Sequence, residues 1–330
     1  MPKIVRFHEL GGPEVLRFDE VPSQKPGKGE VRIKVEAIGL NRAESMFYHG
    51  QYLEQPRFPS RLGYEAAGVV DAVGEGVDTG WIGKRVATVP SFSMAQYGIL
   101  GEEAVVPEAA LGEYPANLTT AQASAIWMQY LTAWGALVHL GGVKAGDFVS
   151  IPAASSSVGL AAIEIVRDAG GKTIALTRTS AKKKELLDFG ADAVIATEEE
   201  DYAARVAEIT AGKCARITFD PVGGPFLDKL AEGAARGGII FEYGWLSLQP
   251  TPFPLFAALG KVLSIRGYLL MEITGNPALL AAAKKYVYDR LADGRFSPKI
   301  AKTFAFAETV EAYKYLESNK QVGKVVISVP

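Results

Sequence analysis

One stretch near the middle of the chain constrains the fold more than any other. Residues 148–172 read FVSIPAASSSVGLAAIEIVRDAGGK. The apolar run at 148–151 is typical of a strand buried on both faces. Small residues at 153–159 predict a tight turn, and a helical pattern follows until Gly170 and Gly171. A strand, a turn and a helix N-terminus in this order form an anion site, because backbone N–H groups and the helix dipole point at the space above the turn.

The turn matches the dinucleotide fingerprint G-x-G-x-x-G only loosely. Its three glycine positions hold Ala154, Ser156 and Gly159. All three residues are small enough for a pyrophosphate to approach the backbone, and Gly159 keeps the position that lets helix and strand pack closely. The alternative is an ordinary turn between a strand and a helix, because such a turn can match the pattern without binding a nucleotide. The candidate cofactor-binding residues of this loop are Ser155, Ser156, Ser157, Val158 and Gly159.

The end of the second expected strand, at 173–177, favours NADPH over NADH. An NAD site places Asp or Glu there, about 20 residues beyond the loop, on the ribose 2′-hydroxyl. This chain has Thr177, Arg178, Thr179 and then Lys182. Hydroxyl, guanidinium and ammonium groups bind a 2′-phosphate, which a carboxylate would repel. The alternative is that these residues form only the solvated start of a helix.

Composition narrows the class of protein. The chain has 330 residues, of which 48% are hydrophobic, enough for two cores. A net charge of −2 argues against a nucleic-acid partner. The single cysteine, Cys214, and the absence of an apolar leader favour a cytoplasmic protein. The most apolar window, 121–140, carries Gln122 and Gln129, so we expect a buried helix there and no membrane contact.

The order of the expected elements predicts an α/β fold. Before about residue 120, an alternating strand at 31–37 and regularly spaced glycine and proline indicate a β-rich, barrel-like domain. The later strands alternate with helices, which predicts a doubly wound parallel sheet. They are expected at 148–151, 173–177, 193–195, 215–220, 238–243 and 262–269. We expect the C-terminal residues to complete the first domain, so that the domains are 1–120 with 275–330, and 121–274.

Two further pairs of residues follow strands of this sheet. Val222 and Gly223 come after the strand at 215–220, and Tyr243 and Gly244 come at the end of the next one. Ligands of doubly wound sheets bind outside the carboxyl ends of the strands. We therefore add these four residues to the cofactor-binding set.

Several segments resemble the medium-chain dehydrogenase/reductase superfamily, over essentially the whole chain. These are GLN at 39–41, GYEAAGVV at 63–70, the loop at 153–159, DPVG at 220–223 and GKVV at 323–326. The match is closest to the zinc-independent quinone oxidoreductase branch, which includes zeta-crystallin. The resemblance implies a GroES-like catalytic domain, an inserted Rossmann domain that binds NADPH, and a homodimer paired along the sheet edge near 262–270.

The chain lacks the usual ligands of a zinc site. A catalytic zinc needs three protein ligands drawn from Cys, His and carboxylates. Zinc-dependent members of the superfamily carry His where this chain has Tyr64, and Cys near Asn41. We therefore expect no metal. Without a metal to polarise a carbonyl, hydride transfer to an electrophilic quinone or enone is favoured over alcohol oxidation.

The resemblance also implies roles for single residues. Tyr52 aligns with the tyrosine that related enoyl reductases use as proton donor, and Asn41 and Thr132 match residues of the nicotinamide pocket. Lys182 matches a phosphate-binding lysine, and Lys324, in the terminal motif, joins the cofactor-binding set. The structural alternatives are a packed loop tyrosine, a turn-forming asparagine and a mid-helix threonine.

The sequence thus predicts a zinc-independent, NADPH-dependent reductase of small-molecule quinones or α,β-unsaturated carbonyls. Two other functions stay open at this point. One is a metal-dependent alcohol dehydrogenase of the same superfamily. The other is a non-catalytic NADPH-binding protein of the crystallin kind.

Overall fold

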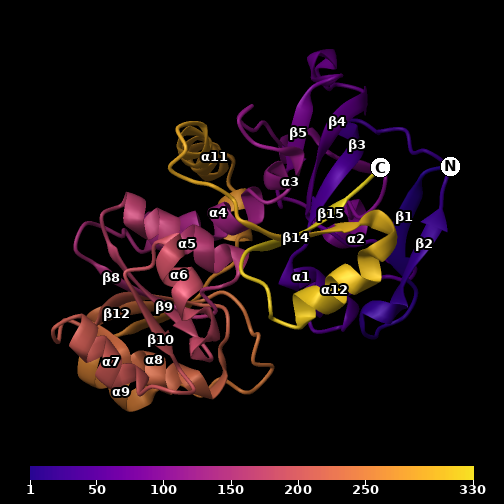
Figure 1. Ribbon diagram of the computed structural model, residues 1–330. Helices are drawn as coiled ribbons and strands as arrows, with labels where there is room; N and C mark the ends of the chain where they lie inside the picture. The colour runs from indigo at the N-terminus through magenta and orange to yellow at the C-terminus, as the bar shows by residue number, and fades with distance from the viewer. The chain divides into compact units, whose positions relative to one another are not determined.

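The chain divides into two units in the computed structural model, which describes residues 1–330 (Figure 1). The first unit is built from both ends of the chain, residues 1–128 and 284–330. The second comprises residues 129–283. The domain limits expected from the sequence, 120/121 and 274/275, stay predictions.

The second unit contains a six-stranded sheet in the order β10-β9-β8-β11-β12-β13. All five strand pairs are parallel, which confirms the doubly wound sheet expected from the alternating pattern. The strands are β8 (Phe148–Ile151), β9 (Lys172–Thr177), β10 (Ala193–Ala196), β11 (Ala215–Asp220), β12 (Ala234–Glu242) and β13 (Ser264–Gly267). β13 is shorter than the strand expected at 262–269 and lies at the edge of the sheet.

Helices connect these strands and cover the sheet. They are α5 (Ser157–Asp168), α6 (Lys183–Phe189), α7 (Tyr202–Ile209), α8 (Leu227–Gly233), α9 (Leu255–Lys261) and α10 (Met271–Thr274). Figure 1 shows α7, α8 and α9 grouped together. Apolar residues of α7 and α8, such as Val206 and Leu230, pack with Ile174 and Ile195 of the sheet in one buried cluster. This burial fixes the strands whose carboxyl ends carry the predicted site.

The first unit is organised around β3 (Glu30–Gly39). Its burial alternates through residues 31–37, as the sequence pattern predicts. β3 pairs antiparallel with β4, β6 and β15, and the full path runs β14-β15-β3-β4-β5-β7. The other strands are β1 (Lys3–Phe7), β2 (Leu16–Glu20), β4 (Glu65–Val73), β5 (Arg85–Thr88), β6 (Glu103–Pro107), β7 (Leu111–Gly112), β14 (Ile300–Ala305) and β15 (Lys324–Ser328).

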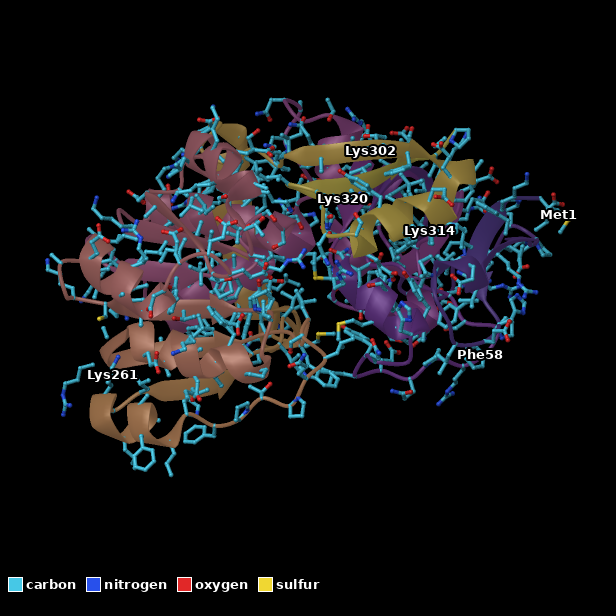
Figure 2. The ribbon with its side chains drawn as sticks, turned by 60° about the horizontal axis from the view of Figure 1, so that its bottom comes forward. Met1, Phe58, Lys261, Lys302, Lys314 and Lys320 are labelled. Carbon is cyan, nitrogen blue, oxygen red and sulfur yellow. The ribbon has the colours of Figure 1, made fainter.

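Three helices either carry residues of the candidate site or belong to the C-terminal part of the chain that completes the first unit. They are α1 (Arg42–Tyr48), α11 (Pro277–Ala292), which spans the division at 283/284, and α12 (Thr309–Glu317). The Asn276 side chain accepts the N–H groups of Ala278 and Leu279, as expected for an N-cap. α12 buries Tyr313 and leaves Lys314 outside (Figure 2).

The single helix expected over 121–140 is wrong. The segment forms α3 (Thr120–Ala123), α4 (Trp127–Trp134) and a π-helical turn at Gly135–Leu140. The break lies at Ser124, where the backbone (φ −73°, ψ 3°) leaves the helical region although its N–H still bonds to the Thr120 carbonyl. Trp127 and Leu131 are nevertheless buried, so the expected burial is confirmed. No helix of the chain is both long enough and apolar enough to cross a membrane.

Candidate functional site

The loop between β8 and α5, predicted to bind phosphate, leads directly into the N-terminus of a capped helix. Ser156 is the N-cap of α5, and its Oγ accepts the Gly159 N–H at 3.0 Å. A Cβ at Gly159 would lie 2.6 Å from backbone atoms of Ala154, so glycine is required there. The hydroxyl proton of Ser156 remains able to donate. The third glycine position of the fingerprint thus fits the close packing that the sequence predicts.

Basic and hydroxyl groups meet at the end of β9. Lys182 Nζ lies 3.0 Å from Ser155 Oγ, which joins the loop to the segment after the second strand. Burial, and then the charge of Arg178, lower the pKa of Lys182. The counter-charge of a bound anion would oppose this lowering and stabilise the charged ammonium. These residues therefore fit the phosphate groups of a dinucleotide.

The turn after β11 is held by a buried carboxylate. Asp220 accepts the N–H groups of Val222 at 2.8 Å and Gly223 at 3.0 Å. Gly223 has a φ of 61°, which glycine adopts without strain. A Cβ at Gly244 would lie 2.6 Å from the Pro221 oxygen. The predicted residues of these two turns are therefore brought together, and the missing side chain of Gly244 lets the two turns pack closely.

Two features of this region were not found from the sequence. Asp220 and Glu242 are register partners at the ends of adjacent strands, and burial raises the pKa of each carboxyl. The signal was an acidic residue at the end of two successive strands. In addition, the Tyr243 ring stacks on Phe219 at 4.0 Å between ring centroids, and its buried hydroxyl has no hydrogen-bond partner. An unsatisfied hydroxyl of this kind is unusual and is open to a polar ligand group.

The first unit contains a buried charged network. Lys324, Asn41 and Glu65 are all less than 10% exposed. Lys324 Nζ donates to Asn41 Oδ1 at 2.6 Å and also to Glu65. The other carboxylate oxygen of Glu65 accepts the Met128 N–H at 2.8 Å. Lys324, predicted from the terminal motif to bind the cofactor, is thus the internal counter-ion of Glu65, and its contact with a cofactor stays a prediction.

A second carboxylate fixes the Asn41 side chain. Glu44 accepts hydrogen bonds from Asn41 Nδ2 and the Tyr64 N–H, each at 3.2 Å, and from the Tyr313 hydroxyl at 2.7 Å. Burial raises the pKa of Glu44 although these bonds oppose it. The Asn41 amide is therefore held from both sides, by Lys324 and by Glu44. Nowhere in the structure do three His, Cys, Asp or Glu side chains gather as a metal site requires.

The predicted proton donor lies beside a second tyrosine. The Tyr52 hydroxyl is 3.4 Å from the Tyr64 hydroxyl. Tyr52 is half-buried and Tyr64 is 1% exposed. Burial raises the pKa of both phenols, so both are protonated near neutral pH. Thr132, predicted to contact the nicotinamide, is distant in sequence from both tyrosines and is buried in α4.

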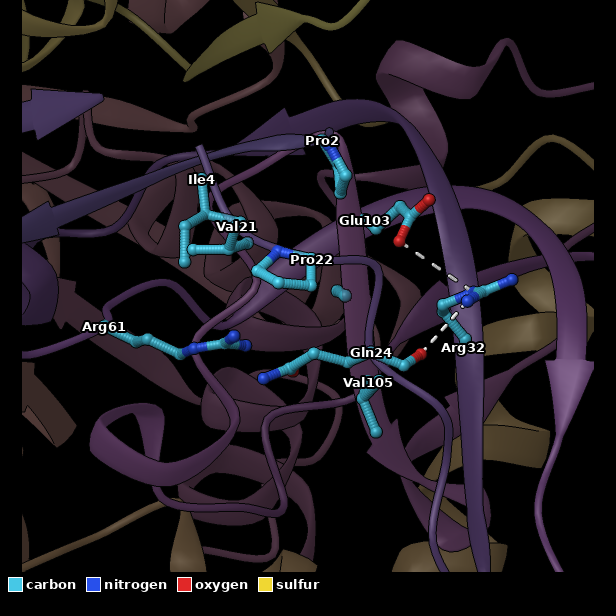
Figure 3. A pocket seen from close by; sticks show the side chains of 10 residues that line it. Pro2, Ile4, Val21, Pro22, Gln24, Arg32, Arg61, Glu103 and Val105 are labelled. Atoms are coloured by element: carbon cyan, nitrogen blue, oxygen red, sulfur yellow. Dashed lines mark hydrogen bonds and ion pairs between the residues drawn. The ribbon is translucent and has the colours of Figure 1, made fainter. Parts of the chain in front are cut away.

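A shallow pocket elsewhere in the first unit contains none of the predicted site residues. Figure 3 shows Arg61 and Gln24 extending toward one another across it, with Arg32 hydrogen-bonded to the Gln24 carbonyl at 3.1 Å. Its lining is Pro2, Ile4, Val21, Pro22, Gln24, Arg32, Arg61, Glu103, Ala104 and Val105.

Two family models match the chain. "Alcohol dehydrogenase GroES-like domain" covers residues 27–132, and "Zinc-binding dehydrogenase" covers residues 157–285. A 2-haloacrylate reductase of a Burkholderia species is 29% identical over 97% of each chain. Quinone oxidoreductase 1 of Escherichia coli is 30% identical over 98% of each chain.

A solved structure gives the same fold. The Escherichia coli quinone oxidoreductase complexed with NADPH superposes with a TM-score of 0.89, at 28% identity and over 99% of each chain. Together with the GroES-like model, this similarity confirms the fold class expected from the sequence.

Proposed function

We propose a function for this chain from its membership of the medium-chain dehydrogenase/reductase superfamily, in which it belongs to the quinone oxidoreductase-like proteins. It is accordingly an oxidoreductase. More specifically, it is a zinc-independent reductase that uses NADPH and delivers hydride to quinones or α,β-unsaturated carbonyls.

The observation that carries this proposal is the buried pair of Glu65 and Lys324. Glu65 follows Tyr64, the residue in the position of a zinc ligand in metal-dependent members. The ammonium of Lys324 contacts both the Glu65 carboxylate and Asn41 Oδ1, two oxygen groups of the same buried network. A cation already placed against these oxygens repels a divalent metal. The reaction therefore depends on an acceptor that is electrophilic without metal activation.

NADPH fits residues of the second unit. The loop at 155–159 and the turns that contain Val222, Gly223 and Gly244 would contact its pyrophosphate and ribose groups. Hydrogen bonds to Ser156 and Asp220 fix the shapes of two of these turns. Lys182, with Arg178 and the hydroxyls of Thr177 and Thr179 in the same segment, would hold the 2′-phosphate. When bound, NADPH supplies the hydride.

The first unit supplies the proton. An acceptor that has gained a hydride carries a negative charge on its oxygen or α-carbon, and it must gain one proton to give the saturated carbonyl or the hydroquinone. Tyr52 donates this proton from its hydroxyl. Asn41, held by Lys324 and Glu44, presents a fixed amide in the same unit, and Thr132 orients the nicotinamide ring.

We also propose a homodimer formed at the edge of the second unit's sheet. β13 pairs with β12 on one side only, so its other edge is available to a second copy. Exposed apolar side chains lie before β13, in and beside α9. They are Phe253, Leu255, Phe256, Leu259 and Val262. Burial of this surface against a second copy would stabilise the dimer.

The test is loss of NADPH absorbance with an ortho-quinone and with a 2-alkenal, each with and without chelator. Elemental analysis of the same preparation measures bound zinc, and NADH is the control cofactor. We expect turnover that survives chelation and prefers NADPH. Turnover lost to chelator would favour the metal-dependent alcohol dehydrogenase instead. Tight NADPH binding without oxidation by either acceptor would favour the non-catalytic binding protein.

A further inference from the structure

We infer that Tyr64 is a positioning residue for the proton-donating step: its buried hydroxyl holds Tyr52 and hydrogen-bonds the Tyr52 oxygen after Tyr52 has given up its proton. The inference rests on the proposed function, because it adds a partner to the proton donor named there.

The Tyr64 hydroxyl contacts only one polar side chain, that of Tyr52. The hydroxyls of Tyr52 and Tyr64 are 3.4 Å apart, and the Tyr64 hydroxyl makes no other hydrogen bond. Aromatic packing fixes both rings, because Phe47 meets Tyr52 edge-on at 6.3 Å and Phe92 packs against Tyr64 at 5.8 Å between ring centroids. Hydrogen bonds in a catalytic site are often long before substrate binds and shorten in the complex.

The charges around the pair explain why Tyr52 needs this partner. Burial raises the pKa of Tyr52, and the carboxylates of Glu54 and Glu44 raise it further. The hydrogen bond with Tyr64 is the one influence that lowers it. Burial, then the neighbouring Tyr52, and then the same carboxylates raise the pKa of Tyr64, so Tyr64 stays protonated as the donor. Without Tyr64, a half-buried Tyr52 phenolate would lie near negative charge with no hydrogen bond from a protein group.

The proton balance of the step is complete. The Tyr52 O–H bond breaks, and a new C–H or O–H bond forms on the reduced acceptor. The Tyr64 O–H then donates to the Tyr52 oxygen and keeps its own proton. Tyr52 is half-buried, so it regains a proton from water, and one proton enters from solvent in each turnover. The acceptor is reduced by the hydride and NADPH is oxidised.

The experiment is Tyr64→Phe, which removes the hydroxyl and keeps the ring against Phe92. We expect kcat with an enone to fall about tenfold, the effect of losing one hydrogen bond to a charged group, with an unchanged Kd for NADPH. The activity of a general acid disappears as pH rises through its pKa. Since loss of Tyr64 raises the pKa of Tyr52, the basic limb of the pH profile should move to higher pH.

A second readout does not depend on turnover. In protein labelled with 3-fluorotyrosine, the fluorine resonance of Tyr52 is assigned by its loss in Tyr52→Phe. We expect Tyr64→Phe to shift this resonance and to raise the pH at which it titrates. An unchanged resonance and titration in a folded Tyr64→Phe protein would overturn the inference, whatever the activity.

Two controls separate a positioning role from a structural one. Tyr97 also packs on Phe92, at 6.2 Å, but its hydroxyl donates to Glu30, so Tyr97→Phe should leave kcat and the pH profile unchanged. Tyr52→Phe with Tyr64→Phe should lose no more activity than Tyr52→Phe alone, because Tyr64 acts through Tyr52. Additive losses would contradict the inference. If the wild type reduces no acceptor, the proposed function fails, and the fluorine titration still decides the contact between the tyrosines.

Discussion

Among the single residues of the first unit, the buried Lys324 is expected to contribute most to the free energy of unfolding. Its ammonium is the only cation in contact with Glu65, and both side chains are 1% exposed. Lys324→Met keeps the length of the side chain and leaves Glu65 buried without a counter-ion. Breaking a buried ion pair from one side costs about 3–5 kcal/mol in the free energy of unfolding.

This loss is measured by urea unfolding followed by circular dichroism. Lys25→Met is the matched control, because Lys25 is exposed and its loss should change the free energy of unfolding little. Glu65→Gln added to Lys324→Met should recover part of the loss, because it removes the unpaired charge. A Lys324→Met protein as stable as the wild type would show that the pair does not hold the network.

The Asp220–Glu242 pair predicts a pH dependence of stability. Burial, and then the charge of Asp220, raise the pKa of Glu242 above its ordinary value of 4.5. A carboxyl with a raised pKa holds more protons in the folded state, so its contribution to stability is lost as pH rises from the ordinary pKa toward the folded one. Glu242→Gln cannot ionise. It should therefore flatten the fall in melting temperature with rising pH and be the more stable protein on the alkaline side.

Thermal unfolding from about pH 5 to about pH 9 measures this effect. Glu198→Gln is the control, since Glu198 is exposed and lies outside the pair. If the melting temperatures of the wild type and Glu242→Gln fell equally with rising pH, the result would contradict the shared burial of the two carboxyls.

At the scale of the elements, we expect the segment that follows β9 to determine the preference for NADPH over NADH. Lys182→Met removes the ammonium that lies 3.0 Å from Ser155. A hydrogen bond from a charged group contributes about 1.5–3 kcal/mol, so the Kd for NADPH should rise about 10- to 100-fold while the Kd for NADH changes little. Lys184→Met, whose exposed ammonium pairs with Asp188, is the matched control. Titration of protein fluorescence with each nucleotide measures both constants. An equal loss for NADPH and NADH would remove Lys182 from 2′-phosphate recognition.

Local pattern predicted most of the elements but not the contacts between distant ones. The buried strands of the second unit and the caps of α3 and α11 follow from periodicity and capping residues close in sequence. By contrast, Asn41 and Lys324 are 283 residues apart, and their contact depends on β15 pairing with β3. The break after α3 is a change of backbone conformation at Ser124, which an apolar window does not reveal.

The candidate site could likewise be predicted only where its residues lie close together in the sequence. The small-residue loop and the basic end of β9 are readable because each lies within one segment. The pairing of Tyr52 with Tyr64 is not, because it needs the positions of two side chains on different segments. The charge of Lys324 likewise becomes informative only when its burial beside Glu65 is known.

For the whole molecule, the exposed apolar side chains near β13 predict the assembly. Phe256 is 90% exposed, which is unusual for a phenylalanine unless another surface covers it. Phe256→Glu should shift the protein from dimer to monomer in sedimentation velocity. Ile82→Glu, at an exposed apolar position of the first unit, should leave the dimer intact. A monomeric wild type would contradict the proposed homodimer.

Isotope labelling follows the hydride from NADPH into the product. NADPH carrying deuterium at the transferred position of C4 is supplied with a 2-alkenal and chelator, and the product is analysed by mass spectrometry. We expect a saturated aldehyde with one deuterium at the β-carbon, and, in heavy water with unlabelled NADPH, one deuterium at the α-carbon from the Tyr52 proton. Product without deuterium from the cofactor, or no product in the presence of chelator, would contradict a zinc-independent hydride transfer.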